Sequence, residues 1–368
     1  MQQHSRSARL TRREVMRLLG VSAGFGLVSS TLQGGASLAE AAAQSATAVG
    51  AKPLSGVPQG AIIRTVLKDV SPDEAGQGVT LFHEHLSTAS WRLPPPRPKN
   101  FREDVDLISE EVKAAATEGI GCIVDCSHPE MGRRLDHLKE VERRTGVLVI
   151  GCAGHYTQAS YPSEIARMSE DQLAEEMVQQ VNSEHLGAFG EIGTSLQITP
   201  DERKVLRAVG RAHLRTGASI IGHTDNGKGA GKTALEQLDL YESAGVRPDR
   251  IVIGHLDGFD EPQLHAAVAK RGAFVGFDRV NSGGDAERDA MRVRNILKFL
   301  EAGFVDKLLI ASDFANEKLI KRNGGPGYAM AWTVFVPKLR AAGVKAEILR
   351  QVMYDNPRRL LAFVPVKG

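Results

Sequence analysis

Short apolar runs alternate with longer amphipathic, charged segments along the chain from Val79 onward. Each run has the length of a β-strand, and the segments between runs have the periodicity of helices. Eight runs can be counted: Val79–Leu81, Cys122–Val124, Val147–Ile150, Ala188–Gly190, Ser219–Gly222, Ile251–Ile253, Ala273–Gly276 and Leu308–Ala311. This alternation is typical of repeated βα units, in which helices cover a parallel sheet.

Eight βα units in one chain predict an α/β protein of the TIM-barrel type, the (β/α)8 barrel. Polar residues that can do chemistry follow several of the runs, and in such a barrel the C-terminal ends of all strands meet at one mouth. A doubly wound open sheet has the same alternation. Its ligand crevice, however, would not readily gather residues from the first, fourth, fifth, sixth and eighth strands. We therefore expect residues 60–368 to form one barrel domain.

The first 39 residues have a composition of their own, with five arginines, one glutamate and an apolar stretch that begins at Leu18. This stretch is short, is interrupted by glycine and serine, and is followed by Ser37-Leu38-Ala39, which suits cleavage better than membrane anchoring. Arg12 and Arg13 resemble the paired arginines of the twin-arginine export signal. We expect a cleavable signal peptide of that type over residues 1–39, transient contact with the export machinery and a periplasmic location.

Residues 40–59 are rich in Ala, Ser, Gly and Pro and lack a hydrophobic period, which predicts a flexible linker. The chain has a formal net charge of +2, but its leader is strongly basic, so the remainder is weakly acidic. Binding of nucleic acid rests largely on neutralising phosphates, and no nucleic-acid partner is expected here. Cys122, Cys126 and Cys152 are too few and too irregularly spaced for a disulfide framework, so we expect buried thiols.

Two histidines lie two positions apart in Phe82-His83-Glu84-His85, directly after the first apolar run. Side chains alternate along a strand, so both imidazoles point to one face and Glu84 points to the other. Two such imidazoles can reach one metal ion. A pair of polar loop residues explains the motif as well, and the metal interpretation therefore depends on the other candidates.

Three further candidates follow later runs. His223 and His255 each come after a β-branched run that ends in glycine, and Asp313 comes after the eighth run. A single histidine at a strand end is more often a hydrogen-bonded structural residue. Two histidines at equivalent positions on successive strands are more readily explained as ligands of one ion.

Glu191 lies among small and apolar residues in Phe189-Gly190-Glu191-Ile192-Gly193, where an ionised carboxylate is costly unless it is paired or bound to metal. A lysine or arginine from elsewhere in the chain is one candidate partner. A pair of metal ions is the other, because a carboxylate has two oxygens and can join two ions at the separation used to activate water.

Over nearly all of residues 62–364, the chain resembles the phosphotriesterase family of the amidohydrolase superfamily. The motifs that carry the resemblance are, in family order, Gly78-Val79-Thr80-Leu81-Phe82-His83-Glu84-His85, Ile123-Val124-Asp125, Met131-Gly132-Arg133, Gly190-Glu191-Ile192-Gly193-Thr194-Ser195, Ile198-Thr199-Pro200, His223-Thr224, Gly254-His255, Ser312-Asp313 and Asp355-Asn356-Pro357. They are spread along the whole candidate barrel, so the resemblance does not depend on one motif.

The resemblance implies a binuclear centre, usually of zinc. One metal would be held by His83, His85 and Asp313, the other by His223 and His255, and Glu191 would join the two. The best-known members carry a carboxylated lysine at the bridging position. This chain instead resembles the glutamate-bridged branch, that of phosphotriesterase-homology and phosphotriesterase-related proteins. No further cofactor is implied.

Two divalent ions in this arrangement would lower the pKa of a shared water, and the resulting hydroxide would attack an ester-type bond of a lactone, carboxylic ester or phosphotriester. Asp313 is the expected proton acceptor. Arg279, in Gly276-Phe277-Asp278-Arg279, resembles the strand-seven Asp-Arg of the lactonase-like branch and is expected to orient an oxyanion. A surface Asp–Arg pair explains the same dipeptide equally well.

Residues 318–328, which include Lys318, Lys321 and Arg322, are expected to form a mouth loop that favours an anionic small-molecule substrate, although a solvated basic loop has the same composition. A metal-stabilised binding protein without catalysis remains the alternative to a hydrolase. The residues themselves indicate no oligomeric state, and the resemblance is compatible with a homodimer.

Overall fold

The computed structural model describes residues 54–90, 92, 96, 98–225, 231–280 and 285–366. The expected signal peptide and most of the expected linker lie outside these residues, so both stay predictions. The described part begins with a short antiparallel pair, β1 (Ile63–Arg64) and β2 (Asp69–Val70). No helix in this part is long and apolar enough to cross a membrane.

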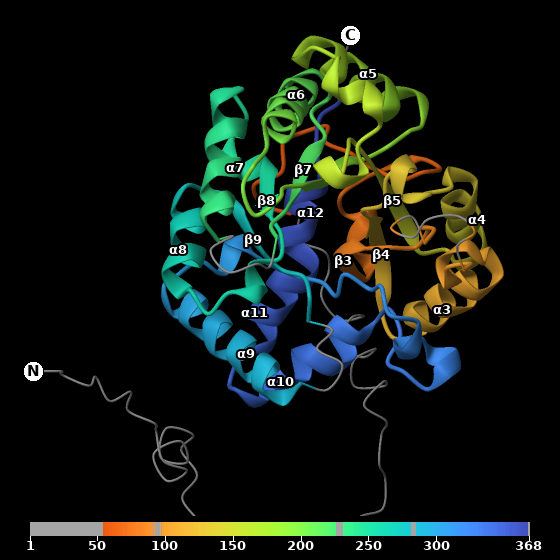
Figure 1. Cartoon of the computed structure of the whole chain (residues 1–368). Helices are drawn as coiled ribbons and strands as arrows, with labels where there is room; N and C mark the ends of the chain where they lie inside the picture. The colour runs from red at the N-terminus through yellow and green to blue at the C-terminus, as the bar shows by residue number, and fades with distance from the viewer. Residues whose placement is uncertain are drawn as a thin grey trace, which may run out of the picture. The chain divides into compact units, whose positions relative to one another are not determined.

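Eight parallel strands form the main sheet, and each expected run supplies one of them (Figure 1). The strands are β3 (Val79–Glu84), β4 (Ile120–Asp125), β5 (Leu148–Ala153), β6 (Ala188–Gly193), β7 (Ser219–His223), β8 (Ile251–Ile253), β9 (Phe274–Phe277) and β10 (Leu308–Ile310). Each strand pairs with the next along the chain. β3 extends three residues beyond the expected apolar run, because its hydrogen-bonded pairing with β4 continues to Glu84 and Asp125. His83 therefore lies inside the strand.

The last strand returns to the first. Just beyond β10, the N–H of Asp313 donates to the carbonyl oxygen of His83 at 3.1 Å. The sheet is therefore a nearly closed barrel of the TIM type, as the eight βα units predict, and not a doubly wound open sheet.

Helices follow the strands and surround the sheet (Figure 1). They are α3 (Val105–Thr117), α4 (Leu135–Thr145), α5 (Glu170–Ser183), α6 (Pro200–Thr216), α7 (Gly231–Ser243), α8 (Pro262–Lys270) and α9 (Ala286–Glu301), followed near the C-terminus by α10 (Val336–Ala341), α11 (Ala346–Arg350) and α12 (Asn356–Leu361). The local sequence explains their limits. In α6, for example, Thr199 and Glu202 form a reciprocal capping box, Pro200 occupies the first turn, and Gly217 ends the helix in the left-handed conformation.

Apolar side chains pack on both faces of the barrel. Inside it lie Phe82, Cys122, Val124, Ile150, Cys152, Ile221, Val252 and Leu309, all almost fully buried. A larger cluster fills the layer between the strands and the helices. The three cysteines are free and buried, which confirms their prediction as core thiols. Because this packing fixes the strands, side chains at the strand ends are carried on a rigid support.

Candidate metal centre

All six residues singled out as metal ligands converge at the C-terminal end of the barrel. They are His83 and His85 from β3 and the position after it, Glu191 from β6, His223 from the end of β7, His255 after β8 and Asp313 after β10. Five of the side chains are at most 6% exposed, and that of Asp313 is 16% exposed. The structure thus brings together residues from the ends of strands one, four, five, six and eight.

Glu191 lies at the centre of this group. Its Oε1 is 3.3 Å from Nε2 of His85, whereas its Oε2 is 3.3 Å from Nε2 of His83 and 3.4 Å from Nε2 of His255. The two oxygens thus face different imidazoles. In the described part of the chain, every ion pair of Glu191 within 4.0 Å is with a histidine, so the alternative of a lysine or arginine partner finds no support.

The backbone of two of the six residues is in an unfavourable conformation. His255 has φ +61° and Asp313 has φ +46°, both in the left-handed region. Such a residue costs on the order of 1–3 kcal/mol unless it is glycine, and it persists only where its surroundings fix it. The backbone N–H of His255 donates to Asp278 at 2.7 Å, and that of Asp313 donates to His83, so both turns are held by hydrogen bonds.

Several polar atoms in this group are buried without a hydrogen-bond partner among the described residues. They include Nε2 of His83, Nε2 of His255 and Oε2 of Glu191, which face one another. Buried polar atoms without partners are costly and call for a ligand or ion. Imidazole nitrogen and carboxylate oxygen form the donor set of first-row divalent ions. The residues present therefore fit a metal centre.

The six residues divide into two ligand groups. His83, His85 and Asp313 form one, and Glu191, His223 and His255 form the other, and within each group one donor atom per residue lies within 4.8 Å of the rest. Burial and the neighbouring His255 lower the pKa of His223 to about 3, so its ring is neutral near pH 7 and offers a lone pair. Burial opposes the ionisation of Glu191, yet its contacts with His255, His83 and His85 hold its pKa well below the ordinary value.

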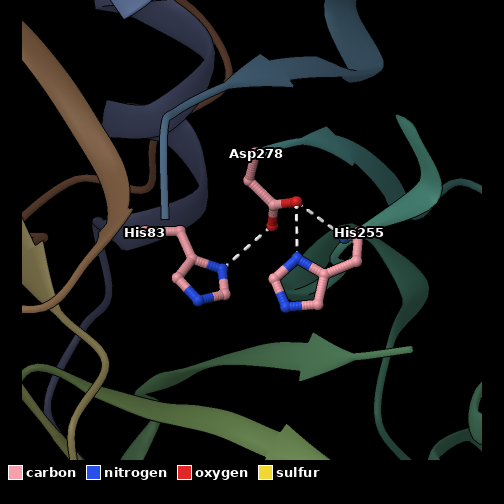
Figure 2. Close-up of side chains that lie close together, drawn as sticks. All are labelled: His83, His255 and Asp278. Atoms are coloured by element: carbon pink, nitrogen blue, oxygen red, sulfur yellow. Dashed lines mark hydrogen bonds and ion pairs between the residues drawn. The ribbon is translucent and has the colours of Figure 1, made fainter. Parts of the chain in front are cut away.

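Asp278 connects the two groups from behind, as Figure 2 shows. Its Oδ2 lies 2.9 Å from Nδ1 of His83, and its Oδ1 lies 2.9 Å from Nδ1 of His255. These three residues could also be taken for a metal site. We assign Asp278 instead as a hydrogen-bond acceptor, because its bonds use Nδ1 of both rings and leave both Nε2 atoms facing Glu191.

Hydrogen bonds from outside the two groups position other members of the centre. Nδ1 of His85 lies 2.9 Å from the Ser127 hydroxyl, which in turn donates to Asp125 at 3.1 Å. Nε2 of His128 lies 2.8 Å from the carbonyl oxygen of Glu191. Sequence analysis singled out neither Ser127 nor His128, and Asp125 entered only as part of a motif.

The model of the phosphotriesterase family matches residues 63–361, which is most of the chain and the whole barrel. The chain belongs to the phosphotriesterase family. The resemblance expected from the motifs is thereby confirmed.

Three relatives illustrate the range of this family. The phosphotriesterase homology protein of Escherichia coli is 30% identical over 76% of this chain and 96% of that protein. Its crystal structure, which is complexed with phosphate in the active site, superposes with a TM-score of 0.71 and covers 77% of this chain and 98% of that one. The N-acetyltaurine hydrolase of Danio rerio is 27% identical over 82% and 98% of the two chains. A lactonase from Listeria monocytogenes is 28% identical with a TM-score of 0.71, covering 82% and 99%.

Relatives of this family are named as hydrolases, and this phosphotriesterase-family chain is a hydrolase. The family is metal-dependent, in agreement with the clustered imidazoles and carboxylates at the barrel mouth.

A cavity of about 320 Å³ opens beside the centre and is lined by Glu191 and Asp313 of the ligand groups. Arg279 also lines it, with Nε donating to Oδ2 of Asp313 at 3.0 Å and Nη2 lying 3.4 Å from Nε2 of His223. The alternative of an Asp–Arg surface pair is wrong, because Asp278 is fully buried and Arg279 faces the cavity. Tyr156, which sequence analysis missed, completes this wall: its hydroxyl lies 3.0 Å from Nε2 of His223.

The expected mouth loop does not supply charge to this cavity. No residue of 318–328 is among the residues that line it. Lys321 pairs with Glu118 at 2.6 Å, and Arg322 pairs with Glu110 of α3. The cavity carries other cations, namely Arg92, Arg102 and Arg279. The composition of the loop thus pointed to the wrong basic residues.

Proposed function

We propose that this chain is a two-metal hydrolase of ester- or amide-type bonds, with zinc as its native metal. The observation that carries the proposal is the position of Glu191, whose two oxygens face different histidines at 3.3–3.4 Å between the two ligand groups. In such a centre, His83, His85 and Asp313 would hold one ion, His223 and His255 would hold the other, and Glu191 would serve both. Bound there, such ions lower the pKa of water and polarise a carbonyl or phosphoryl oxygen.

The side chains around the ions have separate roles. Asp313 accepts a proton from the attacking water, since Oδ1 lies 3.2 Å from His85 and Oδ2 remains directed to the cavity side, where Arg279 donates to it. Arg279 orients the oxyanion that develops on the substrate, because its planar group of donors suits an oxygen carrying negative charge. Tyr156 donates a hydrogen bond beside Arg279, because burial raises the pKa of its hydroxyl and keeps it protonated.

The scissile bond is an ester or an amide. One relative is named for the hydrolysis of a lactone and another for that of N-acetyltaurine, so both acyl–oxygen and acyl–nitrogen cleavage occur on related chains. A phosphoester substrate is the second candidate, because the phosphotriesterase homology protein of Escherichia coli holds phosphate in its active site.

The test is metal analysis coupled to an activity screen. The purified barrel, loaded with zinc, is offered lactones, carboxylic esters, N-acyl amides and phosphoesters. We expect two equivalents of metal and turnover that a chelator abolishes and added metal restores. One equivalent of metal at full activity, or turnover that survives chelation, would contradict the two-metal proposal.

We also propose export of the chain through the twin-arginine route with loss of residues 1–39, supported by Arg12, Arg13 and the small residues that end the leader. A homodimer is the assembly proposed from the family resemblance. Replacing both arginines by lysine is expected to block export. A full-length cytoplasmic protein with its native amino terminus would contradict this proposal.

A further inference from the structure

The cavity beside the metal centre contains an arginine, Arg102, that forms no ion pair with any residue the structure describes. Arg102 lines the same cavity as Glu191 and Asp313, and its exposed fraction is only 9%. Within the described part of the chain, no carboxylate oxygen lies within 4.0 Å of a guanidinium nitrogen of Arg102. Its two side-chain hydrogen bonds go to neutral acceptors: Nε donates to Oδ1 of Asn100 at 3.2 Å, and Nη1 lies 3.5 Å from the carbonyl oxygen of Phe314.

The position of this arginine is fixed by its local structure. Arg102 lies in the short 3-10 helix Phe101–Glu103, which Asn100 and Glu103 cap reciprocally. Oδ1 of Asn100 accepts the backbone N–H of Arg102 at 3.0 Å as well as its Nε, so one side chain holds both the backbone and the guanidinium. Such a group is prepared for a ligand, because little conformational freedom is left to lose on binding.

Burial of an unpaired guanidinium is costly, and arginine does not escape the cost by releasing its proton. Burial lowers the pKa of Arg102. This shift is opposed by electrostatic attraction without direct contact, from the Tyr328 hydroxyl and from the carboxylates of Asp313, Asp125 and Glu191. Two of these carboxylates belong to the proposed metal ligands, and divalent ions bound to them would neutralise their charge. The cavity would then present an excess of positive charge next to the scissile bond.

We propose that Arg102 is a specificity residue that binds a free oxyanion group of the substrate, a carboxylate or sulfonate placed away from the bond that is cleaved. The proposal rests on the proposed hydrolase function and adds the substrate class to it. A guanidinium presents parallel N–H donors that match two oxygens of one oxyanion. Arg279 does not compete for this role, because it is engaged by Asp313 on the metal side of the cavity.

The shape of the site agrees with a small anionic substrate. The cavity of about 320 Å³ is near the lower end of the usual size for small-molecule sites, and Arg102 and Asp313 both line it. Nη1 of Arg102 contacts the carbonyl oxygen of Phe314, the residue after Asp313. A molecule with its scissile group at the metal centre therefore needs only a short spacer to bring an oxyanion to Arg102.

The experiment compares two esters that share one scissile bond. The zinc-loaded enzyme is given 4-nitrophenyl hydrogen glutarate, which has a free carboxylate, and 4-nitrophenyl methyl glutarate, in which that carboxylate is capped. We expect kcat/KM to favour the anionic ester by about 10-fold or more, since a charge-assisted hydrogen bond contributes roughly 1.5–3 kcal/mol. In Arg102→Met this ratio should fall toward one, whereas Arg102→Lys should retain part of it.

The matched control is Arg143→Met on α4, whose side chain is more than half exposed and outside the cavity, and which should keep the wild-type ratio. Equal kcat/KM for the two esters in the wild type, or an unchanged ratio in Arg102→Met, would overturn the anion-binding role while leaving the hydrolase intact. If the zinc-loaded wild type hydrolysed neither of the two 4-nitrophenyl esters, this result would instead contradict the proposed function.

A second measurement remains decisive if Arg102→Met does not fold. Propane-1-sulfonate, a weak metal ligand, should competitively inhibit the hydrolysis of 4-nitrophenyl methyl glutarate by the wild type. Inhibition should be weaker in Arg102→Lys, because a single ammonium lacks the paired donors of a guanidinium. Absence of inhibition in the wild type, or the same inhibition constant in both proteins, contradicts the assignment.

Discussion

Glu84 holds both neighbours of Asp313 in the barrel. Oε1 of Glu84 accepts hydrogen bonds from the backbone N–H and the hydroxyl of Ser312 at 2.9 and 2.7 Å, and Oε2 accepts the backbone N–H of Phe314 at 2.8 Å. The residue that separates His83 from His85 thus fixes the loop that carries the carboxylate from the last strand. Because β3 and β10 are the two ends of the sheet, the same contact completes the barrel and aligns the ligand groups.

The first prediction concerns this contact. Glu84→Gln keeps the shape of the side chain but replaces one acceptor oxygen by an N–H donor that opposes a backbone N–H. Leaving a buried backbone N–H without its acceptor costs about 1–3 kcal/mol, so we expect metal affinity and kcat each to fall by roughly 10-fold. Metal titration and steady-state kinetics measure both. Exposed Glu301→Gln on α9 is the control and should behave as wild type. Wild-type affinity in Glu84→Gln would show that Asp313 keeps its place without this contact.

The second prediction concerns Asp278, which accepts from Nδ1 of His83 and of His255 at 2.9 Å. Asp278→Asn removes the negative charge that orients both rings and sets their tautomers. Loss of such a partner typically lowers metal affinity by about 10–100-fold, and we expect a loss in this range, measured by competition with a chelator. Asp260→Asn, on the surface, serves as the control. A metal affinity within twofold of wild type would show that Asp278 is not needed to orient His83 and His255 for metal binding.

Much of the fold was predictable because its signals are local. Apolar runs mark the strands, and the six candidate ligands are polar residues at the ends of those runs, so both could be located without knowledge of distant contacts. The alternation rule also placed Glu84 on the face opposite His83 and His85, but it could not show which segment that face meets. The partners of Glu84 lie 228 and 230 positions away in the sequence.

The supporting residues were missed for the same reason. Ser127, His128 and Tyr156 follow apolar runs, yet each acts through a contact with a different strand, which no spacing in the sequence encodes. Arg102 lies in a connection between strands, where its significance comes from burial without a carboxylate partner. Composition directed attention to residues 318–328, but Lys321 and Arg322 of that segment pair with Glu118 and Glu110.

The third prediction concerns pH and a buried group that lies outside the ligand set. His155 is 5% exposed on its side chain, with Nδ1 3.6 Å from Glu130 and Nε2 3.5 Å from Glu176. Burial opposes its charge, but the two carboxylates raise its pKa to about 9, and the pKa of Glu130 falls to about 2 because its ion pair with His155 outweighs its own burial. His128 and the ring of Tyr161 also face this cluster.

Because the folded pKa of His155 exceeds the ordinary 6.5, its stabilising contribution is complete below pH 6.5 and disappears as the pH rises toward 9. His155→Gln should therefore lower the free energy of unfolding more at pH 6 than at pH 9.5, as measured by urea denaturation with saturating metal. His137→Gln is the control. Because burial lowers the pKa of His137, the decrease in the free energy of unfolding caused by this substitution should not become larger toward low pH. A pH-independent difference for His155→Gln would contradict a charged histidine in this cluster.

The last prediction is that the charge of Glu191, rather than its size, holds the centre together. Glutamine has nearly the same shape, but it offers one acceptor oxygen in place of two. Four imidazole nitrogens lie within 3.9 Å of the two carboxylate oxygens of Glu191. At least one of the imidazoles would then face an amide N–H, so we expect Glu191→Gln to lose metal and at least about 100-fold of kcat together, because loss of the bridge combines weaker metal binding with loss of the activated water. Elemental analysis and kinetics on the same preparation are needed, since a variant that kept two equivalents of metal but lost activity would point to a role in proton transfer. Two equivalents of metal with wild-type turnover would exclude Glu191 as an anionic bridge.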